Sequence, residues 1–141
     1  MSTHRLQLDD NEPEFRLIGI SCHQKDYRAA WAVGQALDVI FEKQEDWAIN
    51  MRKKDQFVVA VFSYYTVLTE NYSFGLVANL NENRALVPEL SQFDYMLIIS
   101  GIIDSEYEEA LLIRLKRHPL IQFCVFYDPL TIKNWESLPQ F

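Results

Sequence analysis

Two acidic side chains stand close together in the segment Val87-Pro88-Glu89-Leu90-Ser91-Gln92-Phe93-Asp94-Tyr95 and are the first candidates for chemistry. If Glu89 and Asp94 share a cleft, one carboxyl with a raised pKa would act as a general acid. A structural explanation competes, because a carboxylate just before a strand commonly accepts hydrogen bonds from loop amides. We therefore favour a structural or recognition role over catalysis for the binding candidates of this segment, which are Pro88, Glu89, Asp94 and Tyr95.

A second candidate group lies in the loop after the first predicted strand and contains His23 and Asp26. Loops that follow strands often hold ligands, so a small-molecule or anion contact is one interpretation of this loop. Cys22 beside His23 suggests a thiol nucleophile with its base, but adjacent residues of a strand point to opposite faces. Asp26 at the start of a helix would also repel an anion. A structural role is again the favoured interpretation.

Trp135 belongs to the irregular C-terminal segment, where it either clamps that segment onto the domain or binds a partner protein. The sequence has no glycine-rich phosphate loop, paired-histidine metal motif or nucleophile elbow. The three histidines are scattered, and the two cysteines, Cys22 and Cys124, lie far apart in segments that read as strands. We expect buried reduced thiols, no structural zinc and no cofactor.

Composition narrows the class of protein further. With 141 residues, 49% of them hydrophobic, the chain suffices for one domain with its own core. The formal net charge of −7 disfavours binding to nucleic acid or to an anionic membrane surface. Basic residues cluster only at 52–54, where we expect a hairpin turn, and at 114–118, where we expect the last turn of a helix. No apolar run resembles a signal peptide or a membrane span, so we expect a cytoplasmic protein.

The elements that must position these residues follow from apolar periodicity. A helix is expected to begin at Asp26 as its N-cap, with one buried stripe from Tyr27 through Trp31 to Phe41. Gly34 within the stripe suggests a close approach of this helix to the sheet. A second helix opens with the capping-box pair Ser105 and Glu108 and stops at Pro119. Strands are predicted at residues 15–22, 47–51, 57–65, 72–78, 95–99 and 121–127.

This order predicts an α+β fold: a two-layer sandwich, ferredoxin-like or related, with five or six mostly antiparallel strands and two helices on one face. Residues 1–13 are expected to form a flexible N-terminal arm, residues 14–129 a single domain, and residues 130–141 a tail that packs on the domain or on a partner. Several strands are apolar on both sides, so the face without helices must also be covered, by the tail or by another protein.

The segment Val87-Pro88-Glu89 followed by Phe93-Asp94-Tyr95 resembles the signature of a small bacterial family, the IPExxxVDY proteins, with valine for isoleucine and phenylalanine for valine. The similarity extends from about Phe15 onward and includes His23-Gln24-Lys25-Asp26-Tyr27-Arg28 with Trp31, Asn71-Tyr72, the asparagine-rich loop and Asp128-Pro129. The resemblance brings no activity, cofactor or catalytic residue. It implies a cytosolic partner linked to fatty-acid synthesis or RNA processing, because such genes often lie near those for acyl carrier protein, fatty-acid elongation and ribonuclease III.

Two functions follow as hypotheses. The leading one is a cytosolic, non-enzymatic protein-interaction or regulatory module that presents an aromatic sheet face, or the tail around Trp135, to a second copy or another protein. The alternative is a small-metabolite sensor, with a pocket formed by the 23–27 loop together with Glu89, Asp94 and Tyr95.

Overall fold

The computed structural model describes residues 15–101, 104–133 and 135–139, so the predicted N-terminal arm lies outside the described residues. The helices and strands follow one another in the order β1 (Phe15–Ser21), α2 (Asp26–Leu37), β2 (Glu42–Lys43), β3 (Trp47–Lys53), β4 (Gln56–Phe62), β5 (Tyr64–Leu68), β6 (Tyr72–Ala78), β7 (Leu80–Asn81), β8 (Arg84–Ala85), β9 (Tyr95–Gly101), α3 (Ser105–Arg117) and β10 (Phe123–Tyr127). Three short 3₁₀ turns complete them: η1 (Pro88–Leu90), η2 (Pro129–Thr131) and η3 (Trp135–Ser137).

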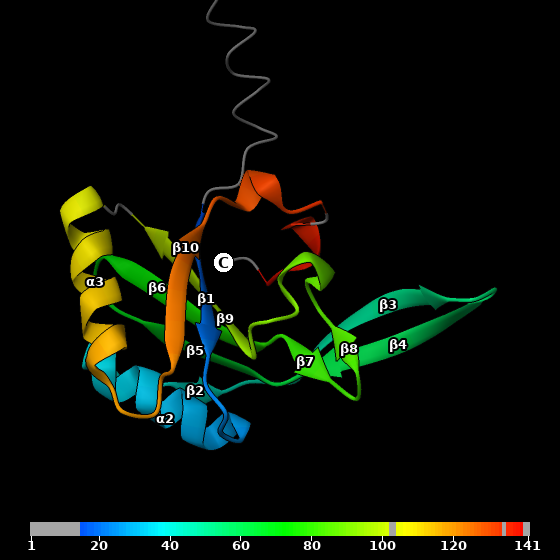
Figure 1. Ribbon diagram of the computed structural model, residues 1–141, viewed down its shortest axis with the longest axis horizontal. Coiled ribbons are helices and arrows are strands. Elements are labelled where there is room, and N and C mark those ends of the chain that lie inside the picture. Colours follow the sequence, from blue (N-terminus) through cyan, green and yellow to red (C-terminus); the bar gives the residue numbers. More distant parts are fainter. Residues whose placement is uncertain (1–14, 102–103, 134, 140–141) are drawn as a thin grey trace, which may run out of the picture.

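The main sheet has six strands in the order β10-β1-β9-β6-β5-β2, and every neighbouring pair is antiparallel. Figure 1 shows this sheet with the helices packed beside it. The α+β prediction with a mostly antiparallel sheet is confirmed. Strands β10, β1, β9 and β6 have the order expected for two interleaved β-α-β units, and the ferredoxin-like relation remains our interpretation of that order. None of the described helices is long and apolar enough to cross a membrane.

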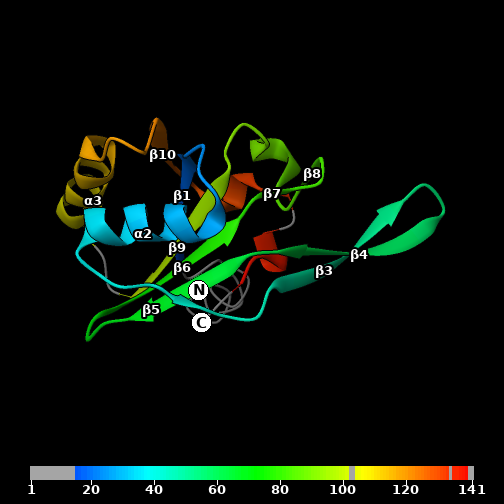
Figure 2. The same cartoon turned by 90° about the horizontal axis from the view of Figure 1, so that it is seen from below.

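Both helices cover one face of the sheet, as Figure 2 shows. Side chains of alternate strand residues reach them, because successive residues of a strand point to opposite faces. Arg16 of β1 forms an ion pair with Glu108 of α3, with 2.6 Å between Nε and Oε1. The rings of Tyr72 on β6 and Tyr107 on α3 stack with centroids 4.4 Å apart. Central strand β9 is buried at every position from Tyr95 to Ile99, as its uninterrupted apolar run predicts.

The opposite face is covered by the C-terminal segment and by the loop before β9. Ile132 and Leu138 are buried in the core, and Trp135 packs its ring against Phe15 at 6.0 Å. From the loop, Phe93 lies over Gly19 of β1, where an added Cβ would stand 2.8 Å from the phenyl ring. Of the two covers predicted for this face, the tail or another protein, the tail lies on it, while Phe123 of β10 is still 53% exposed.

The predicted strand 57–65 is wrong as a single element. The chain leaves one sheet at Phe62 and enters another at Tyr64, with Ser63 between them. Strands β3 and β4 pair only with each other, from Trp47 opposite Phe62 to Lys53 opposite Gln56. They form a two-stranded hairpin that projects far from the main sheet (Figure 1). Apolar and β-branched composition predicts a strand here, but it carries no information on which sheet each half joins.

Helix α2 also differs from its predicted stripe. Of the predicted stripe, Ala30, Gly34 and Leu37 are buried. Tyr27 and Trp31 are instead 66% and 52% exposed, and the small residues Ala29 and Val33 are buried in their place. Small side chains let the helix lie close to the sheet, and the two rings therefore remain outside. Gly34 was expected to let the helix approach the sheet, but its close neighbour is the chain that leaves the helix. A Cβ at Gly34 would lie 2.6 Å from the backbone oxygen of Val39.

Candidate functional site

A single buried asparagine holds the motif segment 87–94 in place. The side chain of Asn79 is fully buried, and its Nδ2 donates to the carbonyl oxygens of Leu90 and Phe93, both at 2.9 Å. Its Oδ1 accepts the amide of Val87 at 2.8 Å. Unpaired polar groups in a core cost free energy, so this network selects one conformation of the segment. From the sequence, Asn79 belongs only to the asparagine-rich loop, and no local signal indicates this role.

Asp94 joins the end of the motif segment to the end of β1. Its Oδ2 accepts the backbone amide of Cys22 at 2.9 Å and lies 3.8 Å from Nε2 of His23. The backbone closes the same junction, since the amide of Asp94 donates to the carbonyl of Ile20 at 3.0 Å. The carboxylate therefore has the loop-binding role that its position before a strand indicates.

Asp26 and Tyr95 belong to the same end of the sheet. Lys25, and not the predicted Asp26, is the N-cap of α2, so Asp26 is the first residue of the helix. Burial alone would raise the pKa of Asp26, but hydrogen bonds from Ser63, the Tyr27 amide and Tyr65 hold it below its usual value. Tyr65 donates its hydroxyl to the Asp26 carboxylate at 3.3 Å.

The two tyrosines at this end of the sheet are held as neutral donors. Burial, and then the nearby charge of Asp26, raise the pKa of Tyr65 to about 12. The hydroxyl of Tyr95 donates to the carbonyl of Gln24 at 2.6 Å, and burial raises the pKa of this phenol well above its usual value. Both hydroxyls are thus protonated at neutral pH and bind the loop that enters α2.

Pro88, Glu89 and Trp135 lie on the side of the molecule that the C-terminal segment covers. Pro88 opens the η1 turn, and Glu89 accepts the backbone amide of Lys133 at 2.8 Å. Trp135 is half-buried against Phe15. These residues fasten the C-terminal segment to the domain, so the clamping interpretation of Trp135 has direct contacts behind it.

The predicted site residues therefore form two groups with different partners. Glu89 bonds the C-terminal segment and Asp94 bonds the end of β1, and within the described part of the chain no hydrogen bond or ion pair joins the two carboxyls. Burial raises the pKa of the Cys22 thiol, which disfavours the thiolate that a nucleophile requires. Across the described ranges no three His, Cys, Asp or Glu side chains cluster as metal ligands would. The arrangement is one of structural support.

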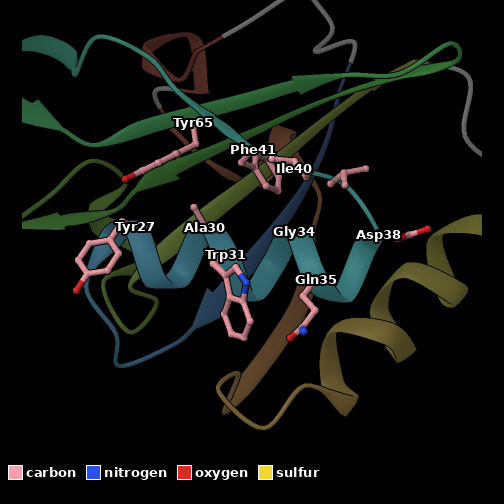
Figure 3. A pocket seen from close by; sticks show the side chains of 10 residues that line it. Tyr27, Ala30, Trp31, Gly34, Gln35, Asp38, Ile40, Phe41 and Tyr65 are labelled. Atoms are coloured by element: carbon pink, nitrogen blue, oxygen red, sulfur yellow. The ribbon is translucent and has the colours of Figure 1, made fainter.

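Hollows lie elsewhere on the molecule. Figure 3 shows a pocket of about 470 Å³ beside α2, where Tyr27 and Trp31 project from the helix, Tyr65 from β5, and Ile40 and Phe41 from the chain that follows the helix. Its lining is mainly apolar, and Asp38 is the one carboxylate among the residues that line it. One smaller hollow, of about 250 Å³, contains part of the pocket predicted from the 23–27 loop with Glu89, Asp94 and Tyr95. Lys25, Asp26 and Tyr95 line this hollow, whereas Glu89 and Asp94 do not.

The β3–β4 hairpin exposes apolar side chains. On its outer side Phe57, Val59 and Val61 are 74%, 61% and 39% exposed. On its inner side Ile49 and Met51 face the motif segment across a groove of about 700 Å³ that Val87, Pro88 and Ile132 also line. The uninterrupted apolar run Phe57–Phe62 predicts a strand that is buried on both sides, and here neither side is fully buried. Exposed apolar surface of this kind marks an interaction site.

The outer edge of β4 is open along part of its length. Near the base of the hairpin, the carbonyl of Val61 accepts Nδ2 of Asn81 at 2.7 Å and so points away from β3. Backbone groups in an antiparallel ladder alternate in direction, so those of Val59 and Phe57 point the same way. We call these two residues the open edge. Natural sheets block such edges with charged residues or proline, and β4 contains neither.

No protein-family model and no curated protein sequence matches this chain. The resemblance to the IPExxxVDY proteins therefore remains a hypothesis based on the motif residues.

Proposed function

We propose that the protein is a non-enzymatic interaction module whose binding surface is the open edge of the β3–β4 hairpin, and that its partner is a second copy of the same chain. The observation that carries the proposal is the projecting two-stranded hairpin with an exposed, uncharged strand. An isolated two-stranded hairpin is marginally stable in water, and a further strand would stabilise it. The sheet face and the Trp135 segment, the surfaces first considered for binding, are occupied within the chain.

Charge favours a second copy as the partner. At the turn end of the hairpin, exposed Arg52 and Lys54 outnumber one exposed acid, Asp55. At its base, exposed Glu45 precedes β3, and exposed Glu82 follows β7, the strand that contacts β4. When two β4 edges pair antiparallel, each basic turn reaches the acidic base of the other copy, which complements charge at both ends. The open edge also sets the register. Phe57 of one copy stands opposite Val59 of the other, and the two Val58 residues face each other on the dyad.

The expected dimer is weak. Cross-strand apolar pairs contribute only about 0.2 to 1 kcal/mol each, and the edge offers few such pairs. Association also costs translational and rotational freedom. We therefore expect a dissociation constant of about 100 µM or weaker, which suits a reversible, concentration-dependent contact.

Sedimentation equilibrium from about 1 µM to 1 mM tests the proposal. Val59→Lys places a charge on the open edge, as natural edge strands do, and should leave the protein monomeric with its circular dichroism unchanged. Leu68→Lys is the control, because Leu68 of β5 is 74% exposed but lies away from the hairpin. A wild-type monomer at every concentration, or equal weakening by both variants, would overturn the proposal.

A further inference from the structure

A groove of about 400 Å³ lies between α2 and the C-terminal end of α3. It is separate from the hairpin edge and from the candidate residues of the sequence analysis. Figures 1 and 2 both show the two helices side by side here. The groove is distant from the hairpin, which projects from the other end of the molecule (Figure 1). Its polar and aromatic lining comes from both helices and consists of Arg28, Trp31, Gln35, Arg114, Arg117 and His118. We call it the cationic groove.

The positive charge in the cationic groove is not neutralised by the protein. Among the described residues, the side chains of Arg28, Arg114 and Arg117 take part in no hydrogen bond or ion pair. Arg114 and Arg117 lie in the last turn of α3, where the helix dipole favours cations. Arg28 lies in the first turn of α2, where the dipole disfavours them. The chain has a net charge of −7, and these three guanidinium groups together form a local positive site that favours binding of an anion.

An aromatic ring stands within the same groove. Trp31 is 52% exposed, with Cζ of Arg28 at 5.6 Å from its ring centroid. The imidazole of His118 meets this indole edge-on, with the centroids 5.8 Å apart. An exposed tryptophan beside arginines is the combination with which proteins stack a flat base and bind its phosphate.

Hydrogen bonds hold the wall of the groove in position. Nδ1 of His118 accepts the amide of Leu120 at 3.2 Å, so the proton of the neutral ring lies on Nε2. That Nε2 donates to Oε1 of Gln35 at 2.7 Å and joins α3 to α2. The imidazole of His118 is therefore oriented before any ligand arrives, which lowers the entropy cost of binding.

We propose that the cationic groove binds a nucleotide. The guanidinium groups of Arg114 and Arg117, with Arg28, receive the phosphates through paired N–H donors, and the indole of Trp31 stacks on the base. The volume of the groove is in the range of small-molecule sites. This site would give the protein a sensing function independent of the hairpin contact.

The test is isothermal titration of the full chain, at low salt, with ADP and with pyrophosphate as separate probes. ADP should bind at least about tenfold more tightly than pyrophosphate because only ADP stacks on Trp31. Arg117→Gln should weaken binding of both probes about tenfold or more, since a charge-assisted hydrogen bond is lost. Trp31→Leu should weaken ADP alone. Arg84→Gln is the charge-matched control, because Arg84 belongs to β8, and it should change neither affinity.

Three results would overturn the proposal. The first is no saturable binding of either probe up to millimolar concentration. The second is equal loss in the Arg117 and Arg84 variants, which would assign binding to net charge. The third is a single-stranded oligonucleotide that binds while ADP does not, which would make the groove a nucleic-acid contact. Circular dichroism of each variant shows that the fold is intact, and none of the substituted side chains is fully buried.

Discussion

Replacing Asn79 by alanine tests whether one buried amide fixes the motif segment. The change removes three hydrogen bonds of 2.8 to 2.9 Å and leaves the Val87 amide and the carbonyls of Leu90 and Phe93 without their partner. A net contribution of about 1 kcal/mol per bond gives a loss of roughly 3 kcal/mol, and stranded buried groups raise it toward 5. That is a large part of the 5 to 15 kcal/mol that typically stabilises a domain.

Urea unfolding at low protein concentration measures this loss. With a slope of about 2 kcal/mol per molar urea, the midpoint should fall by roughly 1.5 M. Asn81→Ala is the matched control: Asn81 is exposed and makes one bond, to Val61, so it should cost less than about 1 kcal/mol. Amide hydrogen exchange should accelerate first in residues 87–94. A loss below about 1 kcal/mol for Asn79→Ala, or uniform acceleration across the chain, would refute the reasoning.

Three further perturbations follow from the packing and the titratable groups. Gly19→Ala should destabilise the fold by about 1 to 3 kcal/mol in thermal denaturation, because the new Cβ would stand 2.8 Å from the Phe93 ring. Adding Phe93→Leu should recover part of this stability, and a Gly19→Ala protein as stable as the wild type would contradict the contact. Burial lowers the pKa of His118, so the unfolded chain binds more protons than the folded one, and the free energy of unfolding should fall as the pH drops below about 6.5. His118→Gln should remove this pH dependence, and a wild-type protein that becomes more stable on acidification would contradict it. Cys22 and Cys124 are buried and their pKa values are raised by burial, so a thiol reagent at about pH 8 should modify them only after denaturation, and rapid native labelling would contradict their burial.

The sequence predicts elements with strong local signals. The central strand β9 is recognisable because it is apolar at every position, and α3 because Pro119 follows its basic last turn. Its N-cap is Asp104, one residue before the predicted Ser105, because the Asp104 carboxylate accepts the Tyr107 amide at 2.8 Å. Ser and Asp are near-equal caps, so composition alone does not choose between neighbours.

The errors arise where long-range packing decides. Nothing local distinguishes a buried Asn79 from the exposed asparagines that follow it, since its partners come from a segment folded back later in the chain. The sequence also gives no sign that the chain changes sheets at Ser63. It therefore does not predict the exposed β3–β4 hairpin. Asp94 and Tyr95 hydrogen-bond the backbone of Cys22 and Gln24 between β1 and α2, whereas Glu89 bonds the C-terminal segment. The sequence indicates that these polar residues bond other parts of the chain, but only the fold shows which parts they bond.

Site-specific cross-linking at Val58 tests the central claim most directly. In the proposed antiparallel pairing the two Val58 residues face each other across the dyad with Cα atoms about 4.5 Å apart, which is within disulfide range. The native thiols are buried, so a Val58→Cys protein should oxidise to a covalent dimer at tens of micromolar, while Leu68→Cys should not. A Val58→Cys protein that stays monomeric, or a Leu68→Cys protein that cross-links equally, would contradict self-association through the open edge.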